Sequence, residues 1–226
     1  TLVLNPALIT QDYDLLRFSA AASLQLPPAH TTPDPADPTT YSTSLISSPY
    51  NVPGHYLDLS SLSTPSLLLA LALTTLAPAR PDYATAPYTE ALNFPIVFST
   101  LRSLITTTRL PFPASSFYVV TFHSTLHPTA SQPLLHTLDF ESHREACESG
   151  GLLKYWFGKA DLGGDRRNLA TCFWAGREEA RRGGRGEWHA KARRAGGELY
   201  EGIVFGTWRL WVGEGGRGWG LEAWED

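Results

Sequence analysis

The order of patterned segments between residues 111 and 212 constrains the fold more than any other feature of this sequence. Strand-like runs rich in β-branched and aromatic residues are joined to stretches that favour helix, and glycines or turn sequences separate them. The strand-like runs cover residues 117–125, 152–159, 169–174 and 203–212, and the helical stretches cover residues 133–149 and 178–195. This β-α-β-β-α-β order predicts a ferredoxin-like α+β unit, with an antiparallel four-stranded sheet and two helices on one face.

The two faces of the predicted sheet differ in character. In the third strand-like run, Thr171 and Phe173 alternate with Cys172 and Trp174. We expect one face to pack on the two helices and the other to be covered, because a large apolar sheet face does not stay in contact with water. The cover is either a second copy of the chain or the N-terminal half of the same chain.

The N-terminal half has a different composition. Residues 1–100 contain no lysine, and their two arginines are Arg17 and Arg80. Repeated prolines in residues 27–38 exclude regular structure there and predict a loop. A short strand is predicted at residues 56–59, and helices are predicted at residues 66–76 and 90–105, the second of them kinked or starting near Pro95. We therefore expect a mainly helical, proline-rich extension, residues 1–110, packed on a core of residues 111–226. Its glycine-rich tail holds two candidate anchors, Trp219 and Trp224.

Charge and composition narrow the class of protein. The formal net charge of −4 gives no general attraction to nucleic acid or an anionic membrane. The longest apolar run, residues 67–73, is far shorter than the ~20 residues of a spanning helix. Cys147 and Cys172 stand far apart without paired ligands, which indicates reduced thiols and no structural metal. Dinucleotide, P-loop, serine-hydrolase and zinc-protease motifs do not occur. The sequence thus predicts a cytoplasmic protein that does not enter a membrane.

Three segments carry a resemblance to a known family. The run GGLLKYWFG, the run NLATCFW with an acidic helix start after it, and the run EWHAKARR resemble the antibiotic biosynthesis monooxygenase-like proteins of the dimeric α/β-barrel superfamily. The full chain is also similar to an uncharacterised fungal protein family with the same core. The resemblance implies a homodimer through back-to-back sheets and a pocket between sheet and helices. Because superfamily members include monooxygenases and haem-binding enzymes, it makes haem the candidate cofactor.

Four residues are candidates for lining such a pocket: His123, Tyr155, Trp174 and His189. Trp174 is placed like a strand tryptophan of the superfamily. An imidazole inside a pocket can exchange a proton near neutral pH or ligate iron, and indole and phenol rings provide apolar walls with a polar edge. The candidate ligand is a small aromatic or anionic molecule. The same aromatic residues also fit a non-catalytic structural or interaction protein, so enzyme activity stays open at this stage.

The segment of residues 177–194 is locally basic. Seven lysines and arginines face three glutamates there, a local charge of +4. Its RRGGRG run is similar to arginine–glycine segments that bind nucleic acid, but it occurs as one short copy in an acidic chain. A solvated helix face or a contact with an anionic ligand is therefore the preferred interpretation, and weak nucleic-acid binding ranks third among the functional hypotheses.

Overall fold

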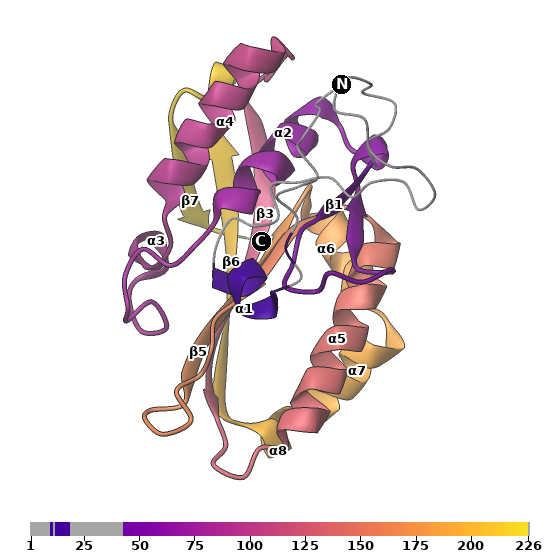
Figure 1. Ribbon diagram of the computed structural model, residues 1–226, viewed down its shortest axis with the longest axis vertical. Helices are drawn as coiled ribbons and strands as arrows, with labels where there is room; N and C mark the ends of the chain where they lie inside the picture. Colours follow the sequence, from indigo (N-terminus) through magenta and orange to yellow (C-terminus); the bar gives the residue numbers. More distant parts are fainter. Residues whose placement is uncertain (1–9, 11, 19–42, 226) are drawn as a thin grey trace.

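The computed structural model describes residue 10, residues 12–18 and residues 43–225, and their fold is α+β with two antiparallel sheets (Figure 1). The larger sheet has the strand order β4-β5-β3-β6-β7. Its strands are β3 (Ser115–Leu126), β4 (Leu152–Phe157), β5 (Arg167–Trp174), β6 (Tyr200–Val212) and β7 (Trp219–Ala223). The smaller sheet pairs β1 (Ser44–Ile46) with β2 (Tyr56–Asp58). The predicted loop at residues 27–38 lies outside the described residues.

Helices lie on both faces of the larger sheet. The N-terminal half contributes α1 (Tyr13–Phe18), α2 (Thr64–Ala72), α3 (Tyr88–Ala91) and α4 (Phe94–Thr108). The C-terminal half contributes α5 (Gln132–Ser149), α6 (Arg177–Gly183), α7 (Glu187–Arg194) and α8 (Gly196–Leu199). Figure 1 shows α5 and α7 side by side, apart from α2 and α4. The order of elements from β3 to β6 is strand, helix, strand, strand, helical segment, strand, as the sequence pattern predicts.

Local sequence explains where α5 begins and ends. The hydroxyl of Ser131 accepts a hydrogen bond from the Leu134 backbone N–H at 3.3 Å, and Pro133 occupies the first turn, where its missing N–H costs nothing. Gly150 ends the helix with a φ of 81°, a conformation that glycine adopts without strain. The structure confirms the predicted helix at residues 133–149, and these local signals explain where it begins and ends.

The sheet has one strand more than predicted. Strand β7 pairs antiparallel with the end of β6, from Trp208 opposite Ala223 to Val212 opposite Trp219. Its five residues, WGLEA, follow a glycine-rich stretch, and the sequence pattern predicts them only as part of the tail. Trp219 anchors the tail, because its ring stacks on Phe98 of α4 with centroids 4.5 Å apart. The four-stranded prediction is therefore corrected to five strands.

The predicted helix at residues 90–105 is divided into α3 and α4. The break lies at Asn93, whose side chain accepts a hydrogen bond from Ala77 N–H and donates one to the Thr75 carbonyl, both at 2.8 Å. Asn93 thereby ties the start of α4 to the end of the η4 turn (Leu73–Thr75). The start of α4 beside Pro95 agrees with the predicted kink or start near that residue, and the contact of Asn93 with Ala77, 16 positions away, is what the sequence does not show. The N-terminal half also contains β1 and β2 and is not purely helical.

The N-terminal half buries one face of the larger sheet. Phe173 and Val119 of that face are fully buried in one apolar core with Phe94 and Leu68 of the N-terminal helices. Burial of such side chains contributes ~1.5–3 kcal/mol each. The cover therefore comes from the same chain, the second of the two possibilities that the sequence left open. A second copy cannot reach this face while the N-terminal half occupies it.

The opposite face of the sheet looks toward α5–α8. Tyr118, Tyr155 and Trp174 form a second, smaller apolar cluster there with Ala146 of α5. The alternation of Thr171 and Phe173 against Cys172 and Trp174 thus separates the two faces, as predicted. Trp224 also packs on this cluster, with its ring 5.0 Å from that of Tyr118. No helix among the described residues is long and apolar enough to cross a membrane.

Candidate functional site

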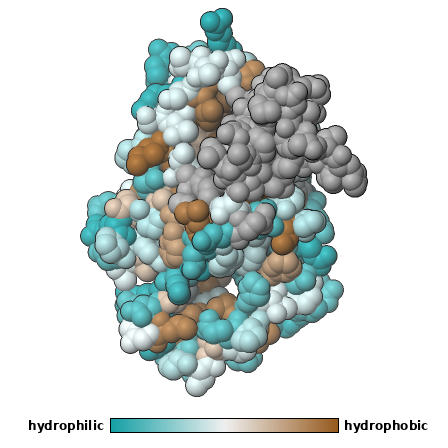
Figure 2. Space-filling model, viewed as in Figure 1, coloured by the Kyte–Doolittle hydropathy of each residue, from teal (hydrophilic) through white to brown (hydrophobic). Residues whose placement is uncertain are grey.

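A cavity of about 750 Å³ lies between the second face of the sheet and helices α5–α8. Strands β3, β4, β5 and β6 supply its floor, α5, α6, α7 and α8 supply its roof, and α1 and the loop at Tyr50 close one side. Figure 2 shows this view of the molecule hollowed below its middle, with apolar side chains along the lower border. Most of the wall is apolar, with Val120, Phe122 and Trp174 among its residues.

Gly183 of α6 leaves room for the Trp174 ring in the cavity wall. A Cβ atom at Gly183 would lie 2.2 Å from the edge of the Trp174 ring, so this position of α6 accepts no side chain. The absence of a side chain at Gly183 therefore lets α6 approach the sheet closely enough to hold the Trp174 indole.

A carboxyl group with two phenols forms the polar centre of the cavity. Asp139 of α5 accepts a short hydrogen bond from the Tyr50 hydroxyl on one oxygen and another from the Tyr155 hydroxyl on the second oxygen. Asp139 lies deep in the protein, and the surface that it still exposes faces the cavity. The three residues come from the loop after β1, from α5 and from β4, so the fold alone brings them together.

Burial controls the protonation of this centre. Removal from water raises the pKa of the Asp139 carboxyl above its usual range, and the two phenol donors offset part of that rise. Burial and the neighbouring carboxyl raise the pKa of Tyr50 and Tyr155 far above their usual value. Burial followed by the charge of Asp139 also raises the pKa of Tyr13 to about 12. The phenols therefore stay protonated at neutral pH and donate to Asp139.

A pair of histidines lies behind this centre. His55 Nδ1 and His143 Nδ1 are 2.8 Å apart, and the two rings are stacked with centroids 5.0 Å apart. One nitrogen donates and the other accepts, which requires at least one neutral ring. Burial lowers the pKa of His55 to about 4 and that of His143 well below its usual value, so both rings are neutral at pH 7. The pair fixes the β1–β2 segment to α5.

His189 is held by a carboxylate. Its Nδ1 lies 3.1 Å from Glu145 Oε2, and the two Glu145 oxygens also accept the backbone N–H groups of Trp188 and His189. Burial alone would raise the pKa of Glu145, but these donors outweigh it and the pKa is lowered. Glu145 thus caps the start of α7 and orients the His189 ring. If Nδ1 carries the proton to Glu145, Nε2 is the nitrogen left to act as base or ligand.

Several polar atoms of the wall have no hydrogen-bond partner among the described residues. They are Ser142 Oγ, Asn168 Oδ1 and Arg17 Nε. Ser142 is 9 % exposed and lies one helical turn beyond Asp139. Buried polar atoms normally find a partner, because an unsatisfied group costs ~1–3 kcal/mol. These atoms have almost no surface open to the cavity, so a ligand can reach them only if a neighbouring side chain moves.

The four residues predicted from the sequence do not all meet. Tyr155, Trp174 and His189 line the cavity. His123 does not, because successive residues of β3 point to opposite faces and Phe122 and Ser124 are the ones that face the cavity. Burial lowers the pKa of His123, which lies toward the other face. The expectation that His123 lines the cavity is corrected accordingly.

Sequence reasoning missed Asp139 and Tyr50. A signal for Asp139 exists, since this acidic residue stands beside Leu135 and Leu138 on the inward side of a predicted amphipathic helix. An acid on an apolar face points to a polar partner or a site. For Tyr50 no such signal exists, because it lies 89 residues from Asp139 in the chain.

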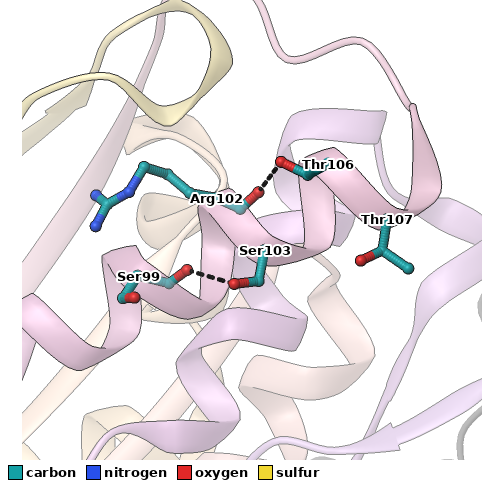
Figure 3. Close-up of a pocket in the computed structure, with 5 residues that line it drawn as sticks. All are labelled: Ser99, Arg102, Ser103, Thr106 and Thr107. Carbon is teal, nitrogen blue, oxygen red and sulfur yellow. Dashed lines mark hydrogen bonds between the residues drawn. The ribbon is translucent and has the colours of Figure 1, made fainter.

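A second depression lies on the outer surface of α4, with a volume of about 330 Å³ (Figure 3). Two of the hydroxyls here are already used by their own helix: Ser103 donates to the Ser99 carbonyl at 3.1 Å and Thr106 to the Arg102 carbonyl at 2.9 Å. Such bonds leave no converging polar groups, so we use this surface as a reference and not as a site.

The structure also locates the candidate metal ligands and the basic segment. Cys147 lies on α5 and Cys172 on β5, and burial raises the pKa of both thiols. Within the described residues, no three histidine, cysteine or acidic side chains are grouped to hold a metal ion. In α6 and α7 three cations pair with glutamates of their own helix: Arg181 with Glu178, Arg182 with Glu179 and Lys191 with Glu187. These pairs fit a solvated helix face.

Comparison with known proteins gives one matching family model and a curated fungal relative. A family model described as PB2B2.08-like matches residues 46–223, which include β2 to β7 and most residues around the cavity. The chain is 37 % identical over 191 residues to the UPF0643 protein PB2B2.08 of Schizosaccharomyces pombe, a match that covers 81 % of this chain and 86 % of the relative. The fungal relative agrees with the predicted fungal family. Neither match supports the resemblance to the monooxygenase-like proteins.

Proposed function

This chain belongs to the PB2B2.08-like family, and we propose that it binds a small, mainly apolar molecule in the cavity between the sheet and helices α5–α8. The observation that carries this proposal is the cavity itself. Tyr155 and Trp174 stand in its wall and leave about 750 Å³ open, within the ~300–1,000 Å³ typical of ligand sites. Side chains that served only to glue sheet and helices together would fill this space.

The distribution of polar groups supports the same function. Apolar side chains form most of the wall, and a few polar groups converge at one end around Asp139, Tyr50 and Tyr155. This combination is typical of a site in which apolar surface supplies affinity and a few hydrogen bonds set orientation. The competing hypothesis, a non-catalytic structural or interaction role, has no comparable use for an open space of this size.

A neutral fluorescent probe tests the proposal. N-phenyl-1-naphthylamine, which fluoresces when it leaves water for an apolar site, should bind the protein with one saturable site. Ala170→Phe places a ring in the cavity and should abolish most of the signal, because Ala170 lies in the wall. The matched control Ser103→Phe, on the exposed surface of α4, should leave binding unchanged. Absence of saturable binding, or equal loss in both variants, would contradict the proposal.

Haem binding or an oxygenase-like activity is the second candidate, and one observation favours it. The contact of His189 Nδ1 with Glu145 resembles the second-shell contact of metal-ligating histidines, and it leaves Nε2 available as an axial ligand or base. The absorbance spectrum of protein purified from its native source, with mass spectrometry of bound molecules, tests this. A Soret band lost in His189→Ala supports haem. An apolar metabolite without a Soret band supports the first candidate.

We further infer that residues 115–212 form a ferredoxin-like unit. The support is the neighbour order β4-β5-β3-β6, all antiparallel, with a helical connection after the first and third strands. The dimeric barrel that the resemblance implies would need a free sheet face, and the N-terminal half occupies that face. Light scattering across concentrations tests the homodimer. A monomer throughout agrees with the cover from the same chain, and a tight dimer requires a different interface.

A further inference from the structure

Four aromatic rings gather at the Asp139 end of the cavity. Tyr13, Tyr50 and Phe157 form a triangle with ring centroids 6.0, 6.1 and 6.2 Å apart, and Tyr155 adds a fourth ring 5.3 Å from Phe157. All four line the cavity, and within each of these four ring pairs the planes are tilted by 44° to 54°. They come from α1, from the loop after β1 and from β4, so they surround one end of the cavity from three parts of the chain.

Such a group of rings suits a cation. The face of an aromatic ring carries negative potential, and a cation within ~6 Å of the ring centroid is attracted to it. The three centroids of the triangle are close enough that one cation can lie within this distance of all three. Aromatic cages of this type recognise organic ammonium groups in other proteins.

The carboxyl group of Asp139 also favours a cationic ligand at this end of the cavity. Both of its oxygens accept hydrogen bonds from neutral phenols, and no lysine or arginine in the described part of the chain forms an ion pair with it. His136 and His189 lie close enough to lower the pKa of Asp139 when their rings are protonated, but neither is hydrogen-bonded to it. A carboxylate this deep is costly to ionise without a positive partner. A cation bound between the rings would supply that partner.

The cations near the cavity do not occupy this place. The guanidinium of Arg17 pairs with Asp14 and stacks on the rings of Tyr13 and Phe18, with its Cζ 5.1 and 4.3 Å from their centroids. Lys159 and Arg193 are exposed at the rim, where water and salt screen their charge. Arg17 also shows that the Tyr13 ring already takes part in a cation–π contact.

From this geometry we propose that the Asp139 end of the cavity recognises an organic ammonium group, so that the ligand is an amphipathic amine or quaternary ammonium compound. The cationic nitrogen would lie against the rings of Tyr13, Tyr50, Tyr155 and Phe157 on their cavity side, and Asp139 would balance its charge. The apolar body of the ligand would extend along Val120 and Trp174. This inference rests on the proposed binding function and adds the chemical class of the ligand.

Two probes of the same shape separate charge from fit. Phenyltrimethylammonium and tert-butylbenzene differ in one central atom, nitrogen or carbon, and therefore in charge. Each is titrated into the full chain and followed by ligand-observed NMR. We expect the charged probe to bind at least about tenfold more tightly than the neutral one, the size of a desolvated cation–π contact. Equal affinity would overturn the ammonium proposal and leave the cavity function standing. Failure of both probes to bind would overturn both proposals.

Variants assign the preference to the proposed residues. Asp139→Asn keeps the size of the side chain and removes the charge, so it should reduce the preference for the charged probe to a few-fold or less. Phe157→Leu keeps an apolar wall without a ring and should also reduce it, which gives a second test if Asp139→Asn does not fold. Ser103→Ala on α4 should change nothing. A charge preference that persists in both cavity variants would place the cation elsewhere and overturn the proposal.

Discussion

The two faces of the large sheet are built from alternate residues of the same strands and are used in opposite ways. On the face toward α2 and α4, Phe173, Val119 and Trp156 are fully buried in a continuous core. On the face toward α5–α8, Cys172 and Trp174 border an open cavity. Both faces are rich in aromatic residues, so composition does not distinguish them. What differs is the partner: one face meets helices that fill it, and the other meets helices held away from it.

Polar contacts on the two faces follow the same division. On the filled face they join two core side chains, such as the Tyr88 hydroxyl and Thr171 Oγ1 at 2.8 Å. On the cavity face they gather around Asp139 and leave Ser142 Oγ without a partner among the described residues. Unsatisfied polar atoms occur on both faces, since Lys154 Nζ and Trp156 Nε1 of the filled face also lack a partner among the described residues. The faces differ in open space and in the phenols grouped around Asp139. The comparison therefore assigns stability to one face and binding to the other.

The largest expected effect comes from emptying the filled face. Phe173→Ala should lower the free energy of unfolding by about 3–5 kcal/mol, because it removes a fully buried ring and leaves a void in a close-packed core. Cys172→Ala, the next residue on the cavity face, should cost less than about 1.5 kcal/mol. Urea denaturation measures both. Comparable losses would show that the two faces contribute equally and would break the comparison.

Lys154 is an exception on the filled face and gives the second prediction. It stands opposite Phe173, is 1 % exposed, and its Nζ has no hydrogen-bond partner among the described residues. Burial lowers its pKa to about 8. Lys154→Met should therefore raise the free energy of unfolding at pH 7 by on the order of 2–3 kcal/mol, because a buried unpaired ammonium is removed.

The pH dependence of the same variant provides its check. Between the folded pKa of about 8 and the unfolded value of 10.5, the unfolded wild-type chain binds more protons than the folded chain. Wild-type stability should therefore gain a contribution as pH rises through this window, and Lys154→Met should lack that contribution. Thermal unfolding at several pH values measures it. A destabilised Lys154→Met protein with the wild-type pH dependence would show that the amine is not buried unpaired.

The smallest effect compares the same enlargement on the two faces. Ala72→Phe adds a ring to α2 in the filled core, where overpacking should cost about 1–3 kcal/mol or more. Ala170→Phe adds the same ring beside the cavity and should change stability by less than about 1 kcal/mol, because there is space to receive it. Equal destabilisation by the two variants would mean that the cavity closes in solution.

The sequence predicted the secondary structure of the C-terminal half well and the site only in part. Ser131, Pro133 and Gly150 mark α5 through short-range effects, so its bounds could be read directly. Strand β7 was missed because its five residues form a strand only beside β6. Tyr155, Trp174 and His189 were placed in the cavity, while His123 failed because the face of a strand depends on its exact register.

What the sequence alone determined is therefore local: where helices begin and end, which runs are strands, and that the strands carry two unlike faces. Only the tertiary structure decided which partner covers each face, and that Tyr50 and Asp139, distant in the chain, share a hydrogen bond at the cavity. The physical reason is that capping, glycine conformation and side-chain alternation act over a few residues. Contacts between distant segments depend on how whole elements pack, and no short pattern in the chain encodes that packing.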